Sequence, residues 1–399
     1  MSKIKIGMFG FGVVGEGLYK VLEESVSANA EIVKVCVKSK GKKRSIDESY
    51  FTYNPDDIFN DKDINLIVEL IDDADESYNI VVRALKSRIP VVSGNKKMLA
   101  YNLPELIEMQ KEYNTTLLYD ASSCGSIPVI RNLEEYYDND LLLSVKGILN
   151  GSSNFILSKI FNENMSYPKA LKMAQDLGFA ESNPTFDVEG YDSLFKLIII
   201  TVHAFGTYIH PDNVLNYGIS KLSDYDINYA REKGLRIKLL ADASKISPTN
   251  ISLQVLPCFV TPDKYIYSVE DEFNGVVIKG QFYDKQFMFG RGAGAFPTGS
   301  SVLSDITAIG HNYSYEYKKL NSFQKMEYTT DWEMSIYVRY SDEADLKIFK
   351  FNNISERYYS EDYKYVIGTI DLKSLLEIRE ELPVRDIFVA KIYSNKINL

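Results

Sequence analysis

The clearest indication of the fold is the N-terminal segment Lys3-Ile4-Lys5-Ile6-Gly7-Met8-Phe9-Gly10-Phe11-Gly12-Val13-Val14-Gly15. Its first part, Lys3 to Phe9, is a short apolar run that is typical of a buried strand. Apolar residues then recur at helical spacing: Val13, Val14, Leu18, Val21 and Leu22. Between the two lies Gly10-x-Gly12-x-x-Gly15, a glycine pattern that follows a strand and opens a helix. This context indicates a dinucleotide-binding loop.

Each glycine of this loop has a physical reason in that interpretation. One allows the tight turn, one lets the backbone approach a pyrophosphate, and one lets helix and strand pack closely. The N-terminus of the helix adds N–H groups and a partial positive charge for the anion. The alternative is a structural turn without a ligand, since the glycine pattern alone is a weak signal.

The next hundred residues alternate between strand-like and helix-like segments. Strands are expected at residues 32–37, 65–71, 91–93 and 116–119, and helices at 77–85 and 103–113. Strands separated by single helices favour a parallel sheet with right-handed crossovers, and ligands bind at the carboxyl ends of its strands. The predicted fold class is therefore α/β, with a doubly wound parallel sheet of the Rossmann type.

The pattern changes after about residue 141. A strand at Leu142–Leu149 leads into Asn150-Gly151-Ser152-Ser153 and helical spacing, and strands with turns fill residues 231–300. We expect a second, α+β domain. The predicted domains are 1–135, completed by about 300–318, for the dinucleotide, then 136–300 for substrate binding, catalysis and dimerisation. A short α+β segment at 319–399 completes the chain.

Composition excludes several functions. The 399 residues carry a formal net charge of −10, which argues against nucleic-acid binding because no excess of Lys and Arg is available for phosphates. The most apolar run, Leu194–Phe205, is too short to span a bilayer. The three cysteines are far apart, which fits neither a disulfide framework nor a zinc site. We expect a cytoplasmic protein without membrane or nucleic-acid partners.

The end of the second strand bears on the choice of dinucleotide. An NAD site usually has an acid there for the ribose 2′-hydroxyl. Here Val37 is followed by the basic run Lys38-Ser39-Lys40-Gly41-Lys42-Lys43-Arg44. This run favours the 2′-phosphate of NADP, with NAD possible as a second cofactor. A solvated basic loop is the alternative.

Two further segments could contact ligands. Ser93-Gly94-Asn95-Lys96-Lys97 follows a strand at the ligand edge of the sheet, so a lysine there could hold a substrate carboxylate or lie near the cofactor. Solvated lysines are the alternative. The glycine-rich run from Gly290 to Gly294, continuing to Ser301, allows either close approach to a ligand or a tight structural crossing. Thr298 could cap the helix that follows.

The densest group of charged residues lies between residues 178 and 196. Asp192 and Lys196 are four apart at the start of a helix, so both project from one face. Asp192 could simply cap the helix and pair with Lys196. Yet Lys196 lies among large apolar residues, and a buried lysine can transfer protons. Nearby carboxylates could bind a substrate ammonium group.

Taken together, these residues resemble the homoserine dehydrogenase family over about residues 3–310. The strongest matches are Gly147-Ile148-Leu149-Asn150-Gly151-Ser152-Ser153-Asn154 and the stretch from Gly178 to Leu197. Ser93 to Lys96 resembles the short lysine motif of the family, and Gly290 to Ser301 extends to Asp305-Ile306. The resemblance implies reduction of L-aspartate 4-semialdehyde to L-homoserine with NADPH or NADH.

The resemblance also implies roles for single residues. Lys196 would donate the proton to the aldehyde oxygen, and Lys96 would lie between cofactor and substrate. The substrate would be bound by Glu181, Asp192, Asp187, Gly151 and Ser152. The cofactor site would comprise Gly10, Phe11, Gly12, Val13, Val14, Gly15, Lys38, Ser93, Lys96, Gly178 and Gly299.

Three more expectations come from the family. A monovalent cation, such as sodium, would be held by Asp120, Ser123, Gly125 and Ile127, although members usually have Glu where Asp120 stands. The chain would form a homodimer through its second domain. Residues from about 332 onward lie where many members carry a regulatory domain, but the usual Pro-Gly turn and helix are not recognisable, so feedback regulation does not follow.

The sequence also departs from the family at Ile71-Asp72-Asp73-Ala74, where members usually carry glycines. Acids beside a cofactor repel phosphate. Together with the altered C-terminal segment, they leave open a catalytically inactive NADP-binding sensor. A dehydrogenase of another small amino or hydroxy acid is a second alternative.

Overall fold

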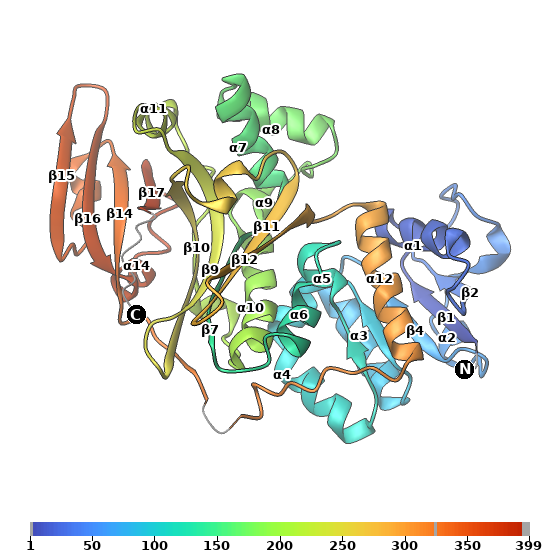
Figure 1. The fold of residues 1–399 in the computed structure, drawn as a ribbon. Helices are drawn as coiled ribbons and strands as arrows, with labels where there is room; N and C mark the ends of the chain where they lie inside the picture. Colours follow the sequence, from blue (N-terminus) through green and yellow to red (C-terminus); the bar gives the residue numbers. More distant parts are fainter. Residues whose placement is uncertain (1–2, 323–324, 393–399) are drawn as a thin grey trace. The chain divides into compact units, whose positions relative to one another are not determined.

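The computed structural model describes residues 3–322 and 325–392, which form two compact units. Unit 1 comprises residues 1–138 and 291–318, and unit 2 comprises residues 139–290 and 319–399 (Figure 1). Over the described ranges, no helix is both long and apolar enough to cross a membrane.

Unit 1 is built on a six-stranded sheet with the order β3-β2-β1-β4-β5-β6. All of its neighbouring strands run parallel. The strands are β1 (Ile4–Phe9), β2 (Ala30–Cys36), β3 (Phe51–Thr52), β4 (Leu66–Glu69), β5 (Val91–Ser93) and β6 (Leu117–Leu118). The chain adds β2 and β3 on one side of β1 and then β4, β5 and β6 on its other side, as in doubly wound dinucleotide-binding sheets. The predicted Rossmann-type fold is confirmed.

Three helices of unit 1 begin earlier than expected, two of them directly after a side chain that caps the helix. Asp73 caps α3 (Ala74–Lys86), and Asn95 caps α4 (Lys96–Tyr113), which continues through Pro104. The predictions of starts at residues 77 and 103 were wrong. So was the predicted cap at Thr298, because α12 (Ala295–Gly310) already begins three residues earlier. The others are α1 (Val13–Glu24), α2 (Asp56–Phe59), α5 (Ala121–Cys124) and α6 (Val129–Glu135).

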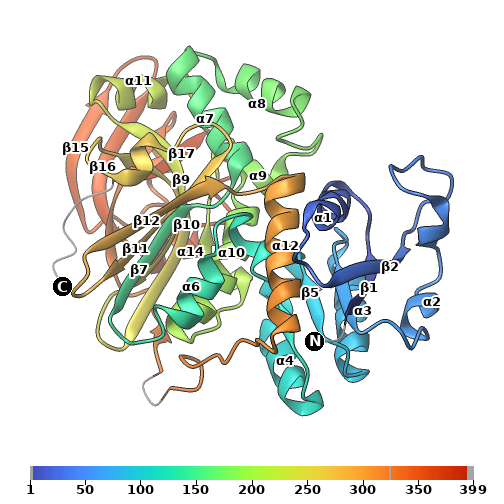
Figure 2. The same ribbon diagram turned by 45° about the vertical axis from the view of Figure 1, so that its right-hand side comes forward.

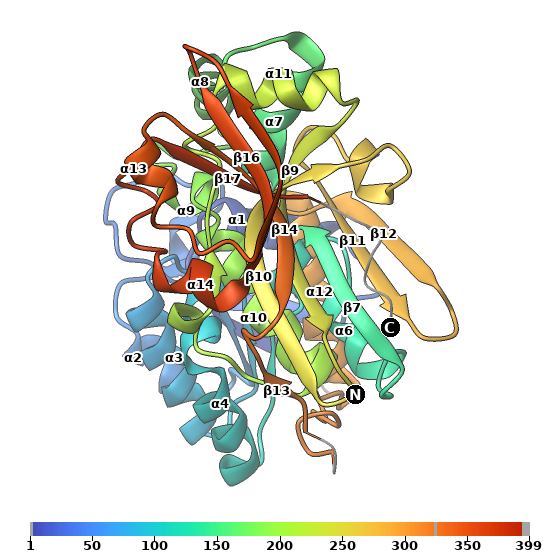
Figure 3. The ribbon, with the colours of Figure 1, turned by 90° about the vertical axis from the view of Figure 1, so that its left-hand side faces the viewer.

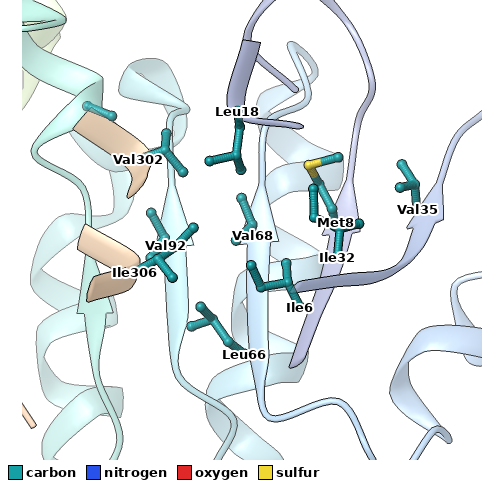
Figure 4. Packing of buried hydrophobic residues seen from close by; sticks show 11 residues of the cluster. Ile6, Met8, Leu18, Ile32, Val35, Leu66, Val68, Val92, Val302 and Ile306 are labelled. Carbon is teal, nitrogen blue, oxygen red and sulfur yellow. The ribbon is translucent and has the colours of Figure 1, made fainter. Parts of the chain in front are cut away.

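The core of unit 1 joins segments from both ends of its sequence. Ile6, Met8, Val68 and Val92 project from the sheet, and the helices α1 and α12 cover them with Leu18, Val302 and Ile306 (Figure 4). Helices α1 and α12 lie side by side (Figure 2). A segment from residue 295 onward therefore completes the dinucleotide-binding unit.

Unit 2 contains an eleven-stranded sheet with the main order β12-β11-β7-β9-β10-β17-β14-β16-β15. Its strands are β7 (Leu142–Ile148), β9 (Arg236–Lys245), β10 (Asn250–Val260), β11 (Phe273–Gly280), β12 (Lys285–Arg291), β14 (Glu333–Tyr340), β15 (Asn353–Tyr359), β16 (Lys364–Asp371) and β17 (Ile387–Ile392). Two short strands, β8 (Leu215–Asn216) and β13 (Glu327–Tyr328), pair with β10.

Helix α10 (Tyr191–Phe205) lies on one face of β7, β9 and β10 (Figures 1 and 3). From residue 192 to its end all of its residues are buried. The other helices in this part of unit 2 are α7 (Gly151–Glu163), α8 (Tyr167–Asp176), α9 (Thr185–Val188) and α11 (Asp224–Glu232). The predicted strand at Leu142–Leu149 and the helices after it are confirmed.

The last part of the chain has a recognisable topology of its own. It runs β14, α13 (Glu343–Leu346), β15, β16, α14 (Leu372–Glu377) and β17, and its strands lie in the order β17-β14-β16-β15. This is the ferredoxin-like βαββαβ arrangement. Strand β17 also pairs with β10 at Cys258 and Phe259, so the segment continues the larger sheet.

Candidate active site and dinucleotide site

The glycine-rich loop follows β1 and opens α1. Gly10 has φ +94°, and a Cβ there would lie 2.5 Å from the Leu70 carbonyl oxygen. A Cβ at Gly15 would lie 2.7 Å from the Gly10 carbonyl oxygen. A Cβ at Gly12 would meet nothing within 4 Å, and Gly12 caps α1 without a side-chain bond. The turn, the close packing and the open approach to a helix N-terminus all fit a bound pyrophosphate.

Side chains next to this loop differ in exposure. Val13 is 68% exposed and Val14 is half-buried. Phe11 packs edge-on against Phe51, with ring centroids 5.2 Å apart. The loop therefore presents small, open surface at its tip and an aromatic group at its base.

Helix α1 crosses α12 at two glycines. A Cβ at Gly17 would lie 2.0 Å from the Ala295 carbonyl oxygen, and one at Gly299 would lie 2.7 Å from the Leu18 nitrogen. Gly299 therefore serves this helix crossing in the structure. Gly17, which sequence reasoning missed, serves the same crossing.

The basic run after β2 is partly neutralised. Lys38 forms an ion pair with Glu76, and its Nζ lies 3.9 Å from Asp73 Oδ2. The hydrogen bond to Glu76 raises the pKa of Lys38. Arg44 stacks over the Phe51 ring at 4.8 Å and donates to the Ser39 carbonyl at 2.7 Å. The acid at position 73 is explained by its cap on α3, where it accepts from the Glu76 backbone N–H.

Ser93 belongs to a buried network at the carboxyl ends of β4 and β5. Its Oγ donates to Glu69 Oε2 at 2.6 Å, and Glu69 Oε1 accepts from the Ile71 N–H at 2.7 Å. Burial raises the pKa of Glu69. Asn95 caps α4 and donates to the Ile71 carbonyl, which places the half-buried Lys96 in the first turn of that helix. Sequence reasoning missed Glu69 because its role depends on Ser93, which comes from the neighbouring strand.

Lys196 is held inside unit 2 by two bonds. It is 6% exposed, its Nζ lies 2.8 Å from Asp192 Oδ2, and it donates to the Leu149 carbonyl at 2.6 Å. An ammonium group has three N–H donors. Two are used here, and one remains for a ligand oxygen.

Asn150 joins the carboxylates of this site. Its Oδ1 accepts from the Ser153 N–H and so caps α7, while its Nδ2 donates to Asp187 Oδ1 at 2.7 Å and to Asp192 Oδ2 at 3.0 Å. The sequence motif contained Asn150, but only the structure shows this bridging role. Asp187, Asp192 and Lys196 are therefore brought together around one buried amide.

Four other predicted substrate or cofactor residues of unit 2 lie outside these bonds. Glu181 is exposed, and over the described ranges no hydrogen bond or ion pair holds its carboxylate. Ser152 donates to the Phe179 carbonyl. A Cβ at Gly151 would lie 2.6 Å from the Glu272 carbonyl oxygen. Gly178, which follows α8, has φ +76°, and a Cβ there would meet nothing within 4 Å.

The predicted cation ligands lie in unit 1 around a buried pair of acids. Asp120 Oδ1 accepts from the Ile130 and Arg131 N–H groups, and the Asp120 N–H donates to Asp305. Burial and the Asp305 charge raise the pKa of Asp120 to about 7. Arg131 pairs with Asp305 at 3.0 Å. Ser123 Oγ is buried and has no partner among the described residues.

Comparison with known proteins agrees over both units. A model of the family "Homoserine dehydrogenase" matches residues 128–307, and one of "Homoserine dehydrogenase, NAD binding domain" matches residues 10–120. The homoserine dehydrogenase of Bacillus subtilis is 35% identical, over 78% of this chain and 74% of that protein. That of Helicobacter pylori is 34% identical, over 78% and 75%. A crystal structure of a homoserine dehydrogenase from Thiobacillus denitrificans superimposes with a TM-score of 0.83 at 27% identity, over 99% of both chains.

The fold, the glycine-rich loop and these matches define an NAD(P)-dependent oxidoreductase that acts on a CH–OH group. The chain belongs to the homoserine dehydrogenase family. Its activity is the reduction of L-aspartate 4-semialdehyde to L-homoserine, a step of amino-acid biosynthesis. The resemblance predicted from the motifs is confirmed.

Proposed function

We propose that Lys196 donates the proton to the aldehyde oxygen of L-aspartate 4-semialdehyde. The observation that carries this proposal is the buried ammonium group with two of its three N–H donors fixed by Asp192 and the Leu149 carbonyl. A fixed cation stabilises the negative charge that develops on the oxygen and then transfers its proton.

Asp192 and Asp187 bind the substrate ammonium in this proposal, with Glu181 as a third carboxylate. Asn150 holds Asp187 and Asp192 in place by donating to both. Gly151 and Ser152 lie beside this amide at the start of α7 and line the same site. Selectivity for an amino acid follows, because a substrate without the ammonium group cannot make these charged contacts.

The dinucleotide supplies the hydride when it is bound. In our proposal the loop Gly10-Phe11-Gly12-Val13-Val14-Gly15 holds its pyrophosphate, with the backbone N–H groups of α1 directed at the anion. Ser93, Lys96, Gly178 and Gly299 border the remaining parts of the cofactor. Lys96 also contacts the substrate.

NADP is the preferred dinucleotide in this proposal, with NAD as a slower alternative. No acid lies between the end of β2 and Asp47, and Lys38 and Arg44 supply positive charge at that strand end. Lys38 would leave its ion pair with Glu76 and bind the 2′-phosphate instead. The ion pair with Glu76 is exposed and therefore weak, so little stability is lost when it is replaced.

Homoserine oxidation measured by absorbance of the reduced cofactor is expected to be faster with NADP than with NAD. Lys38→Met is expected to raise KM for NADP about tenfold and to leave KM for NAD within about twofold. Lys43→Met, at an exposed position of the same loop, is the matched control. Equal effects of Lys38→Met on both cofactors would mean that the loop does not read the 2′-phosphate, without affecting the assigned reaction.

We also propose a monovalent cation site formed by Asp120 and by Ser123, Gly125 and Ile127. Two buried carboxylates, Asp120 and Asp305, face the single guanidinium of Arg131, so one further positive charge fits there. The unpartnered Ser123 Oγ is an additional oxygen at the site. A hard cation such as sodium prefers oxygen ligands of this kind.

Sodium chloride is expected to raise the thermal midpoint of the protein more than choline chloride at equal ionic strength, because sodium binds the folded state. Asp120→Asn is expected to abolish that difference. Lys62→Gln, at an exposed position of unit 1, serves as a control with an altered charge elsewhere. The same sodium dependence in Asp120→Asn and the parent protein would rule the site out.

We also propose how the functions divide along the chain. Residues 1–135 with 300–318 bind the dinucleotide, residues 136–300 bind substrate and form a homodimer, and 319–399 is an appended α+β segment. Three free, buried cysteines suit the reducing cytoplasm.

A further inference from the structure

A cavity of about 590 Å³ lies in unit 2 on the face of the sheet that α10 does not cover. Side chains directly opposite each other in an antiparallel pair point to the same face. Lys146 of β7 pairs with Asp242 of β9, whereas Val145 pairs with Ala243 and faces the other way. A Cβ on Gly190, the residue before α10, would lie 3.6 Å from Leu239 Cδ2. Leu239 projects from the same face of β9 as Ala243, so α10 lies on that face. The cavity with Lys146 is therefore on the face opposite to α10 and Lys196.

The walls of this cavity carry an excess of positive charge, although the whole chain is acidic. Three carboxylates line it, those of Asp263, Asp284 and Glu333, and Asp242 lies behind the wall. Six ammonium groups line it: Lys146, Lys245, Lys264, Lys279, Lys285 and Lys391.

Two of these lysines share one buried carboxylate. Asp242 Oδ2 lies 3.2 Å from Lys146 Nζ and 2.9 Å from Lys391 Nζ. Burial alone would raise the pKa of Asp242, but the two ammonium groups hold it well below its usual value. The side chains of Lys146 and Lys391 are only 12% and 10% exposed. Both ammonium groups are therefore held, largely desolvated, in the wall of the cavity.

Trp332 supplies a further donor. Its ring lies 4.8 Å from Lys391 Nζ and lines the cavity. Its indole Nε1–H is buried and has no acceptor within the described parts of the chain. Lys279 and Lys285 likewise have no ion pair there. The cavity is rich in donors and poor in acceptors.

We propose that this cavity is a binding site for a small dianion, a phosphate group or a dicarboxylate. Lys391 and Lys146 contact the ligand from the sheet, the Trp332 N–H donates to it, and Lys279 and Lys285 close the rim. This site is separate from the homoserine dehydrogenase site, because its residues lie on the other face of the sheet. It does not depend on the roles proposed for Lys196 or the cofactor loop.

Trp332 allows a direct test, since it is the only tryptophan of the chain. The full-length protein, without cofactor or substrate, is titrated with inorganic phosphate and separately with succinate at constant ionic strength. We expect a saturable change of tryptophan fluorescence at millimolar concentration or below, and none with acetate. Tighter binding of phosphate identifies a phosphate group as the natural ligand chemistry, and tighter binding of succinate identifies a dicarboxylate.

Two variants test the contacts. Lys391→Met leaves Asp242 paired with Lys146 alone and is expected to weaken binding about tenfold or more. Lys279→Gln with Lys285→Gln changes only the rim, so it keeps the test valid if the buried variant folds poorly, and it should weaken binding severalfold. Lys347→Gln with Lys373→Gln removes the same charge at exposed positions away from the cavity and is the control.

Three outcomes would overturn the proposal. One is the lack of a saturable change with either dianion. Another is equal binding by the rim variant and the control. The third is a parent protein in which neutral acrylamide cannot reach Trp332, because a second copy of the chain would then cover this face.

Discussion

Lys196→Ala is expected to lower kcat for homoserine oxidation by about 10²–10⁴-fold, the range for loss of a positioned general acid or base. The Kd for NADP should stay within about twofold, because Lys196 is not among the residues proposed to bind the dinucleotide. Stopped-flow turnover and a separate binding titration measure the two quantities.

Two further variants separate proton transfer from structure. Lys196→Arg keeps a cation beside Asp192, yet a guanidinium does not release a proton near neutral pH, so it should restore folding without restoring turnover. Lys172→Ala removes a lysine from another i,i+4 pair, with Asp176 at 2.7 Å, on an exposed helix surface. Its activity should equal that of the parent. If Lys196→Ala also keeps activity within a few-fold, Lys196 is only the ion-pair partner of Asp192.

Gly17→Ala is expected to destabilise unit 1 by about 2–4 kcal/mol, because its Cβ would overlap a backbone oxygen of α12 that no side-chain rotation can move away. The thermal midpoint should fall by roughly 5–15 °C. Differential scanning calorimetry measures this change.

Gly12→Ala is the matched comparison on the same helix. Gly12 has φ −92°, which alanine adopts without strain, and its Cβ would meet nothing within 4 Å of the protein. Its thermal midpoint should therefore equal that of the parent, while binding of NADP should weaken about tenfold because the methyl group occupies the approach of the pyrophosphate. Equal thermal midpoints of Gly17→Ala and Gly12→Ala would mean that α1 and α12 can move slightly apart without a loss of stability.

Local pattern was enough to predict the fold of unit 1. A strand, three glycines and an amphipathic helix follow one another directly, and each of these signals lies within a few residues. Gly17 carries no such signal, because its constraint comes from Ala295, far along the chain. Pairing across distant segments is set by packing, which a single sequence does not display.

The site was predictable in its chemistry but not in its connections. Asp192 and Lys196 were found because a lysine stood within an apolar helix. Asn150 and Glu69 were not singled out, since an amide that bridges two carboxylates and a carboxylate buried against Ser93 are recognisable only from their partners. The basic cavity was hidden for a related reason: its lysines are scattered from residue 146 to 391 in a chain of negative net charge.

Asn150 limits which mutations this enzyme can tolerate. Ser, Thr, Asp and Asn all cap helices well. Aspartate at this position would add a third negative charge beside Asp187 and Asp192. Serine and threonine each have one hydroxyl hydrogen, so neither could serve both carboxylates while accepting from the helix. Among these four capping residues, only asparagine combines an acceptor with two donor hydrogens, so replacing Asn150 by any of the other three should disturb either the cap or the two carboxylates.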